Sequence, residues 1–178
     1  MQIDEEALFN FDGYFRGHAG RVHAYLLRRA DADCAQDATA ETFLIAWRRR
    51  SEMPAEPLPW LYGIARGVLA NELRAANRRA ALASRIAAQP PAWSPGVGGD
   101  HEILEALAAL RENDREALLL CAWEGLSTRE AATVLGCSAA AFAVRLHRAR
   151  GRLARVLQQT GAETELTPAS DAVPEVPR

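Results

Sequence analysis

The sequence predicts an all-α protein with two small helical domains joined by a flexible linker, the second domain containing a helix-turn-helix. Ala, Leu, Arg and Glu, which favour helices, are abundant along the chain. No stretch combines alternating β-branched residues with hairpin turns. The segment "AAQPPAWSPGVGGD", residues 87–100, places prolines and glycines between two helical regions and is therefore predicted to be the linker.

The first domain, residues 1–86, is predicted to contain three helices. Apolar spacing places these helices near 5–29, 33–50 and 57–86. Asp31 or Asp33 can accept hydrogen bonds from the free backbone amides at the start of the second helix. Pro59 suits the first turn of the third helix.

The second domain, residues 101–158, is predicted to contain four helices, and the polar, acidic tail 159–178 is predicted to be disordered. The helices are expected near 101–111, 113–124, 128–135 and 139–158. Ser127 or Thr128, followed by Glu130, forms a capping pattern at the start of the third. Gly136 ends that helix, and Ser138 can cap the next.

Two faces are predicted on the last helix. Its apolar stripe consists of Phe142, Leu146, Ala149, Leu153 and Val156. Its basic row consists of Arg145, Arg148, Arg152 and Arg155. Such a row can neutralise DNA phosphates, although an isolated row is also compatible with an ordinary solvated face. The short helix, the glycine turn and the long basic helix together favour DNA binding.

Charge is distributed unevenly along a chain whose net charge is -2. Residues 45–80 hold 7 Arg and 3 acids, and residues 101–158 hold 8 Arg and 7 acids, whereas residues 1–44 hold 4 Arg and 8 acids. The sequence therefore predicts two local basic patches within an acidic whole.

Enzyme, metal and membrane functions find no support in the sequence. His18, His23, His101 and His147 have no metal-ligand spacing, and neither a phosphate-binding glycine loop nor a G-x-S-x-G motif is present. We expect no catalytic residues, no metal and no cofactor. Without a long apolar run or a signal-peptide pattern, we expect no membrane insertion and a cytoplasmic location.

Two stretches resemble one known family. "EGLSTREAATVLGCSAAAFAVRLHRARGRL" resembles region 4, the promoter-reading module of the extracytoplasmic-function (ECF) sigma factors of bacterial RNA polymerase. "CAQDATAETFLIAW" followed by "PWLYGIARGVLANELRAANRR" resembles region 2 of the same family. The two motifs stand in the family's order on either side of the linker, and together they cover most of residues 8–157.

The resemblance implies that the helix over 33–50 binds the largest subunit of core RNA polymerase. The implied polymerase-binding residues are Asp37, Glu41, Thr42 and Phe43. Asp37 and Glu41 are four residues apart and so share a helix face, which is also compatible with an ordinary acidic surface. Phe43 and Trp47 share the same spacing and are alternatively core residues.

The resemblance also implies two DNA-binding surfaces. In region 2 the implied minus-10 residues are Arg66, Asn71, Arg74, Arg78 and Arg79, with Arg48, Arg49 and Arg50 adding to a basic groove. In region 4 the implied minus-35 residues are Ser138, Ala141, Phe142, Arg145 and Arg148. Trp60 and Tyr62 are expected to pack in the core, because their setting is apolar.

Several positions depart from the family pattern. Ala141, Ala143 and Val144 stand where the family often has Thr, Lys and Ser, and Ala40 stands where Gln is common. The family commonly has a basic residue at the position of Gly63, an Asn at that of Gly67 and an Asp at that of Asn71. We therefore expect weak or unusual promoter recognition. We also expect the two glycines to allow close helix packing.

The sequence thus favours a sigma factor that directs core polymerase to promoters and assists DNA opening. Its expected partners are core RNA polymerase, promoter DNA and an anti-sigma factor. An alternative is a sigma-like interaction protein that binds an anti-sigma factor or polymerase without reading promoters. An independent helix-turn-helix repressor would leave the region 2 motifs unexplained.

Overall fold

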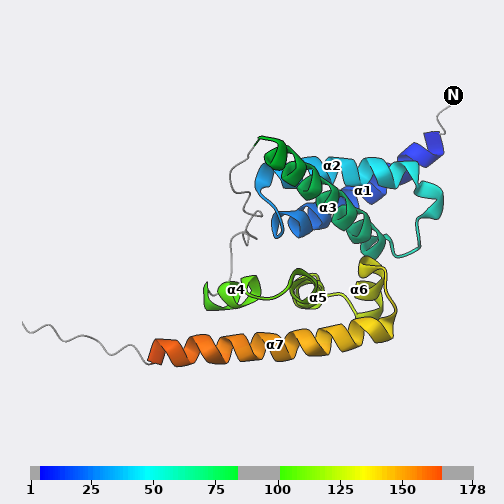
Figure 1. Ribbon diagram of the computed structural model, residues 1–178. Coiled ribbons are helices and arrows are strands. Elements are labelled where there is room, and N and C mark those ends of the chain that lie inside the picture. Colours follow the sequence, from blue (N-terminus) through cyan, green and yellow to red (C-terminus); the bar gives the residue numbers. More distant parts are fainter. Residues whose placement is uncertain (1–4, 84–100, 166–178) are drawn as a thin grey trace, which may run out of the picture.

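The computed structural model describes residues 5–83 and 101–165, and all regular structure within these ranges is helical (Figure 1). The first unit contains α1 (Glu5–Leu27), α2 (Ala32–Arg48), the 3-10 turn η1 (Arg50–Glu52) and α3 (Pro57–Ala83). The second unit contains α4 (His101–Ala108), α5 (Glu112–Ala122), α6 (Thr128–Leu135) and α7 (Ala139–Glu165). The all-α prediction is confirmed. The predicted linker 87–100 lies outside the described residues.

Local capping explains where the helices of the first unit begin. The Asp31 carboxylate accepts a hydrogen bond of 2.9 Å from the Cys34 amide. Asp31, one of the two predicted caps, therefore fixes the start of α2. Helix α3 begins at Pro57 and carries Pro59 in its first turn, where a missing amide hydrogen costs nothing.

The core of the first unit lies where α1, α2 and α3 meet. Val22, Phe43 and Leu61 are buried there. Tyr25 of α1 and Tyr62 of α3 are fully buried and stack with ring centroids 4.6 Å apart. The prediction that Tyr62 packs in the core is therefore confirmed, and Trp60 packs against this core while staying partly exposed.

In the second unit, α6 and α7 form the predicted helix-turn-helix. The Ser127 hydroxyl accepts a hydrogen bond from the Glu130 amide, and the Glu130 carboxylate accepts one of 2.8 Å from the Ser127 amide, so a complete capping box is present. Gly136 ends α6 with φ 62°, a left-handed conformation that favours glycine. The Ser138 hydroxyl accepts a hydrogen bond of 3.2 Å from the Ala141 amide and so caps α7.

Helix α7 runs along the outer side of the second unit, and α4, α5 and α6 pack against it (Figure 1). Phe142, Leu146 and Ala149 are buried, which confirms the start of the predicted apolar stripe. The helix continues to Glu165, so the prediction of a disordered tail is wrong for residues 159–165. The stretch contains Gly161 and two threonines, which disfavour helix, but it extends an existing helix and so needs no new nucleation. The remainder of the tail lies outside the described residues.

The two units pack against each other, and α3 contacts α6 (Figure 1). Gly63 of α3 lies at this contact, because a Cβ atom placed on it would be 3.9 Å from the Val134 backbone. The expectation of close packing is thus confirmed at Gly63. It is wrong at Gly67, where a Cβ atom would meet open space.

A buried polar cluster joins the end of α1 to α5 and the residues after it. We call Tyr25, Arg28, Arg29, Glu116 and Glu124 the interface cluster. Arg29 donates through Nε to Glu116 at 2.8 Å and through Nη1 to Glu124 at 3.1 Å. Arg28 donates to both oxygens of Glu124, at 2.5 and 3.2 Å. The Tyr25 hydroxyl donates to Glu116 at 2.9 Å.

Arg29 and Glu124 of the interface cluster are almost fully removed from water, whereas Arg28 stays partly exposed. Side-chain exposure is 7% for Arg29 and 2% for Glu124. Burial alone would lower the pKa of the Arg29 guanidinium, but the charges of Glu116 and Glu124 and the hydrogen bond to Glu116 act to raise it. Burial, followed by the neighbouring Glu116 charge, raises the pKa of Tyr25 well above its ordinary value of 10.0. Arg29 therefore stays charged and Tyr25 stays neutral, as these hydrogen bonds require.

We predict that Arg29→Met separates the two units without unfolding them. The substitution removes the ion-pair partner of Glu116, while Glu124 keeps its pair with Arg28, and an uncompensated buried charge costs about 3–5 kcal/mol. Because the two carboxylates lie at an interface between units, moving the units apart returns them to water. The radius of gyration measured by small-angle X-ray scattering should increase, while the helical circular dichroism stays unchanged. Arg16→Met, which removes an exposed pair with Asp12, is the control. An unchanged radius of gyration for Arg29→Met would contradict this prediction.

We also predict that Ser127→Ala destabilises the second unit by about 1 kcal/mol at neutral pH, because it removes the cap of α6. The Ser127 hydrogen bonds lower the pKa of Glu130 below its ordinary value of 4.5. Their charge-assisted contribution is complete above that value and is lost as the pH falls through the lower, folded-state pKa. Urea unfolding at several pH values should therefore show a difference between wild type and variant that shrinks in acid. A difference that grows in acid would exclude this role of Glu130.

Candidate nucleic-acid interface

The outward side of α7 carries the residues that the sequence predicts to meet DNA in the second unit. Ser138, Ala141 and Arg148 are exposed, and Arg145 is partly exposed. Ala141, Arg145 and Arg148 follow one another at spacings of 4 and 3, so they line one side of the helix. The structure therefore brings these predicted residues together on a single surface.

Phe142 is an exception, because its side chain is fully buried. It forms the core stripe with Leu146 and Ala149, on the side of α7 that packs against α5 and α6. The prediction that Phe142 contacts DNA is therefore corrected: this buried ring packs α7 against the core of the second unit and so positions the helix.

Arg152 also differs from the expectation of an uninterrupted basic row. Its guanidinium forms an ion pair with Asp114 of α5, whose carboxylate is only 7% exposed. This pair attaches α7 to α5 and engages the Arg152 guanidinium within the chain, while 38% of its side chain stays exposed. Arg155 donates to the Gly151 carbonyl and remains exposed.

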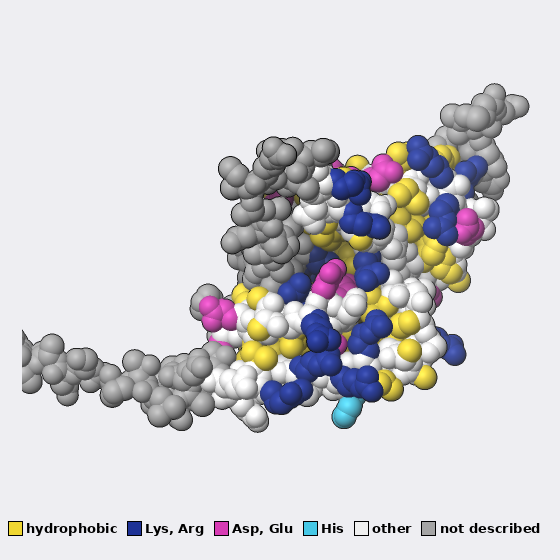
Figure 2. All heavy atoms as spheres, viewed as in Figure 1, with side chains coloured by type: hydrophobic (Ala, Val, Ile, Leu, Met, Phe, Trp, Pro, Cys, Tyr) yellow, Lys and Arg dark blue, Asp and Glu magenta, His cyan; other side chains and the backbone are white. Residues whose placement is uncertain are grey.

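Figure 2 shows the surface that results. Dark blue basic side chains gather along the lower face, over α5 and α7, and yellow apolar side chains lie at the end of this row where α7 begins. A polyanion such as DNA would meet positive charge along this face and an apolar patch at the start of the helix.

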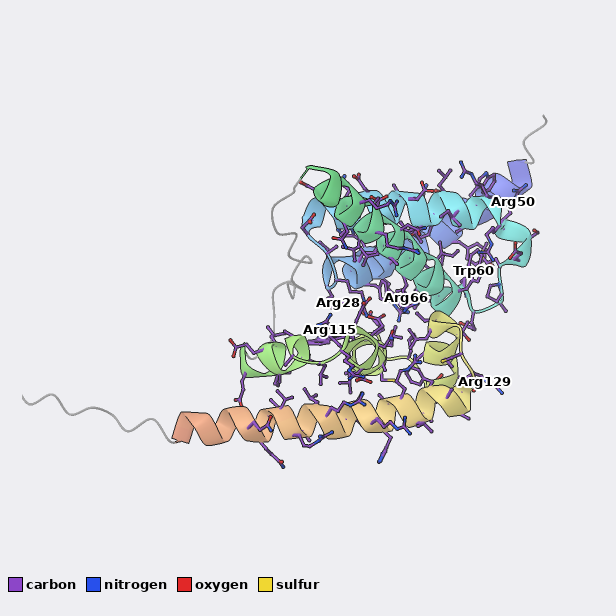
Figure 3. All side chains as sticks on the ribbon, viewed as in Figure 1. Arg28, Arg50, Trp60, Arg66, Arg115 and Arg129 are labelled. Carbon is purple, nitrogen blue, oxygen red and sulfur yellow. The ribbon has the colours of Figure 1, made fainter. Side chains whose placement is uncertain are left out.

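Basic and aromatic side chains form a second surface at the end of α2 in the first unit. The Arg50 guanidinium lies 4.5 Å from the centre of the Trp47 ring, and the Arg49 guanidinium lies 5.9 Å from that of Trp60. Arg48, Arg49 and Arg50 are exposed. Figure 3 shows Arg50 and Trp60 at the same end of the first unit. Exposed cations beside aromatic rings suit the backbone and unstacked bases of a single strand.

The implied minus-10 residues of α3 do not gather at that end. Asn71, Arg74 and Arg78 are exposed, and Arg74 donates to the Asn71 side-chain oxygen at 2.6 Å. Eighteen residues of helix separate Trp60 from Arg78, a length of about 27 Å. The predicted basic groove is therefore two separate groups of arginines.

Arg66, a further member of the implied minus-10 set, lies elsewhere. Arg66 is partly buried on the side of α3 that faces the second unit (Figure 3). It lies close enough to act electrostatically on Tyr25 of the interface cluster. The side chain of Arg79 lies outside the described residues.

The implied polymerase-binding acids line a groove between α2 and α3. Asp37 and Glu41 are exposed and contribute to its wall together with Asp31 and Glu72. The groove has a volume of about 640 Å³, and Val68 and Leu73 supply apolar surface within it. Such a surface suits a basic partner with apolar side chains.

Thr42 and Phe43 do not reach that groove. The Thr42 hydroxyl is buried and donates to the Ala38 carbonyl at 2.6 Å, within its own helix. Phe43 is 4% exposed and contacts Phe15 edge to face at 4.8 Å. The expectation of direct polymerase contact is therefore corrected for both residues: Thr42 bonds within α2, and Phe43 packs α2 against α1.

The interface cluster and the arginine pairs with Trp47 and Trp60 were not predicted. About ninety residues separate Arg29 from Glu116, so no local spacing joins them. The one available signal was two acids, Glu116 and Glu124, on either side of the apolar run "ALLLCAW".

Among the described residues, no helix combines the length and apolar content needed to cross a bilayer.

Comparison with known protein families identifies both units. The family model described as sigma-70 region 2 matches residues 14–79, and the one described as sigma-70, region 4 matches residues 100–153. The two matches correspond to the two units of the structure and appear in the order that the motifs indicated.

Curated relatives carry the same identification. The chain is 32% identical over 160 residues to RNA polymerase sigma factor CarQ of Myxococcus xanthus, covering 86% of this chain and 92% of CarQ. It is 34% identical over 138 residues to ECF RNA polymerase sigma factor EcfG of Rhodopseudomonas palustris, covering 75% and 76%. It is 37% identical over 142 residues to the probable RNA polymerase sigma factor RfaY of Xanthomonas campestris pv. campestris, covering 72% of this chain but only 35% of that protein.

Among solved structures, the sigma factor RpoE from Bartonella quintana, crystallised in complex with the anti-sigma factor NepR, has a similar fold. The TM-score is 0.66 at 24% identity, and the likeness covers 84% of this chain and 97% of that one. The family matches, the relatives and the fold agree: the chain belongs to the extracytoplasmic-function family of RNA polymerase sigma factors, with region 2 in α1–α3 and region 4 in α4–α7.

Proposed function

We propose that this sigma factor, in the cytoplasm, directs core RNA polymerase to promoters through two separate DNA-binding surfaces and assists the opening of the duplex. One observation carries the proposal: α7 presents exposed Arg148 and partly exposed Arg145 on the outward side of a capped helix-turn-helix. The protein contributes recognition, and the polymerase contributes the chemistry, since sigma factors are initiation factors and not enzymes.

Region 4 enters the major groove of the upstream element with the first turns of α7. An α-helix fits that groove, and in a helix-turn-helix the second helix makes the base contacts. Arg145 and Arg148 contact phosphates along the groove, while Ser138 and Ala141 stand at the end of the helix that points toward the bases. Phe142 and Arg152 act from within by fixing α7 on α5 and α6.

Region 2 holds the melted strand of the downstream element. The surface of Arg49, Arg50, Trp47 and Trp60 combines positive charge with aromatic faces, which is what an unstacked strand requires. Asn71, Arg74 and Arg78 extend along α3 and contact the duplex next to the melted segment. These two groups of arginines lie too far apart to bind a single phosphate cluster, so each engages a different part of the DNA.

The acidic groove between α2 and α3 binds core polymerase. Asp37 and Glu41 provide the negative charge, and the apolar floor provides area that can be buried against a helix of the partner. An anti-sigma factor is a further partner that we propose from membership of the family.

The alternative is a sigma-like interaction protein that binds polymerase or an anti-sigma factor without reading promoters. The absence of polar side chains at Ala141, Ala143 and Val144 favours this alternative, since hydrogen bonds to base edges cannot come from these residues.

Transcription in vitro distinguishes the two functions. Core polymerase is supplied with a fragmented genomic library, with and without the full-length protein, and the transcript start sites are sequenced. We expect new start sites preceded by two spaced sequence elements. Binding to core polymerase with no new start sites would instead support the sigma-like interaction protein.

We predict that Arg148→Ala weakens DNA binding by a similar factor on all sequences and lowers the slope of log K against log salt by about 1. The reason is that one phosphate contact releases roughly 0.9 of a counterion from duplex DNA. The measurement is a salt titration of binding by the protein assembled with core polymerase. Arg16→Ala, far from α7 on α1, should keep the wild-type slope. If Arg148→Ala keeps the wild-type slope, Arg148 does not contact a phosphate.

A further inference from the structure

The first turns of α7 are apolar and exposed to solvent. Val144 is 51% exposed, and Ala139, Ala140, Ala141 and Ala143 are exposed as well. About half of the Val144 residue stays in water at the start of a DNA-facing helix, and this half gains nothing from burial within its own chain. Its apolar surface is therefore available to a partner.

Val144 points away from the core of the second unit. Successive residues of a helix are rotated by about 100°, so Val144 lies about 200° around the axis from the buried Phe142. It shares its side of the helix with Arg148, four residues further on, which is also exposed. The apolar patch of Ala140, Ala141 and Val144 therefore faces outward next to an arginine.

The charge around this patch identifies the occupant. Between residues 131 and 162 the chain contains no Asp or Glu, whereas five arginines follow Val144 within eleven residues, of which only Arg152 forms an ion pair with a described acid, Asp114. Figure 2 shows the same arrangement, with apolar side chains at the end of the basic row over α7. A partner that places apolar groups beside a line of negative charge satisfies both features, and the major groove of DNA does so.

Only one apolar group projects from the bases into that groove. Thymine carries a C5-methyl group there, whereas the other major-groove edges that distinguish bases present hydrogen-bond donors and acceptors. Alanine and valine side chains can neither donate nor accept hydrogen bonds, but they contact a methyl group favourably. Because alanine is small, it also lets the helix backbone come close to the base edges.

We infer that the patch of Ala140, Ala141 and Val144 recognises the upstream promoter element through the C5-methyl groups of thymine, and that Val144 is its specificity-determining residue. This inference rests on the proposed function and deepens it, because it names what region 4 reads. Promoters selected by this protein contain thymine, on either strand, at the positions that face the first turns of α7. The arginines hold the helix on the backbone and the patch supplies the discrimination.

Replacement of thymine by deoxyuridine tests this inference, since it removes the methyl group and leaves the base pairing intact. The probe is a promoter duplex obtained from the genomic library, with deoxyuridine at the thymines of the upstream element alone. The full-length protein assembled with core polymerase should bind this duplex more weakly than the thymine duplex. We expect about a fourfold increase in Kd for each methyl group that the patch buries.

Val144→Ser and Ala154→Ser separate the patch from the rest of the helix. Both residues are exposed on α7, and Ala154 lies ten residues further along, about 15 Å away. Val144→Ser should bind the thymine and deoxyuridine duplexes with nearly equal affinity, whereas Ala154→Ser should keep the wild-type preference. Circular dichroism of both variants establishes that the helices remain folded.

The outcomes distinguish the inference from the proposed function. Equal affinity of the wild-type assembly for the two duplexes, with promoter-specific transcription intact, would overturn the inference and leave the function standing. An upstream element without thymine on either strand, or an undiminished thymine preference in Val144→Ser, would also overturn it. If the library yields no promoter at all, the proposed function fails and the inference falls with it.

Discussion

Burial of the Arg29 guanidinium between the two units is the constraint on which their arrangement depends. A charge that is only 7% exposed has to be matched by carboxylates with good geometry, and Glu116 and Glu124 provide them from the second unit. Arg28 neutralises Glu124 further, and Tyr25 satisfies the second oxygen of Glu116. Since most partners of this cation belong to another part of the chain, the cluster specifies one arrangement of the two units and disfavours others.

This arrangement has consequences for both DNA-binding surfaces. Packing of α3 against α6 places Gly63 next to Val134 and turns Arg66 toward the second unit. The arginines at the end of α2 and the outward side of α7 remain exposed. The interface therefore occupies one side of α3 and leaves the other groups accessible. The number of arginines along α3 does not reveal this division. Arginines on opposite sides of a helix have different environments, although the sequence alone does not distinguish them.

Helix α7 shows how one helix combines structural and recognition roles. Phe142, Leu146 and Ala149 bury one side, and Asp114 holds Arg152 from α5. These contacts prevent α7 from rotating, so the same side, with Val144 and Arg148, always faces outward. The precision of a recognition helix thus comes from residues that do not touch DNA. Phe43 plays a similar structural part in α2: it packs against Phe15 of α1, while Asp37 and Glu41 of the same helix stay exposed.

The sequence alone determined the all-α class, the left-handed glycine at the end of α6 and the family, and it limited the caps of α2 and α6 to two candidates each. These features depend on residues within one or two turns of each other, or on motifs that are contiguous in the chain. The tertiary structure decided which predicted site residues are exposed, since Phe142, Thr42 and Phe43 share their motifs with exposed neighbours but face the core. The tertiary structure also decided that Arg152 pairs with Asp114 and that Arg29 forms ion pairs with Glu116 and Glu124. Such pairs join positions far apart in the chain, and only the packing of the helices brings their charges within hydrogen-bonding distance.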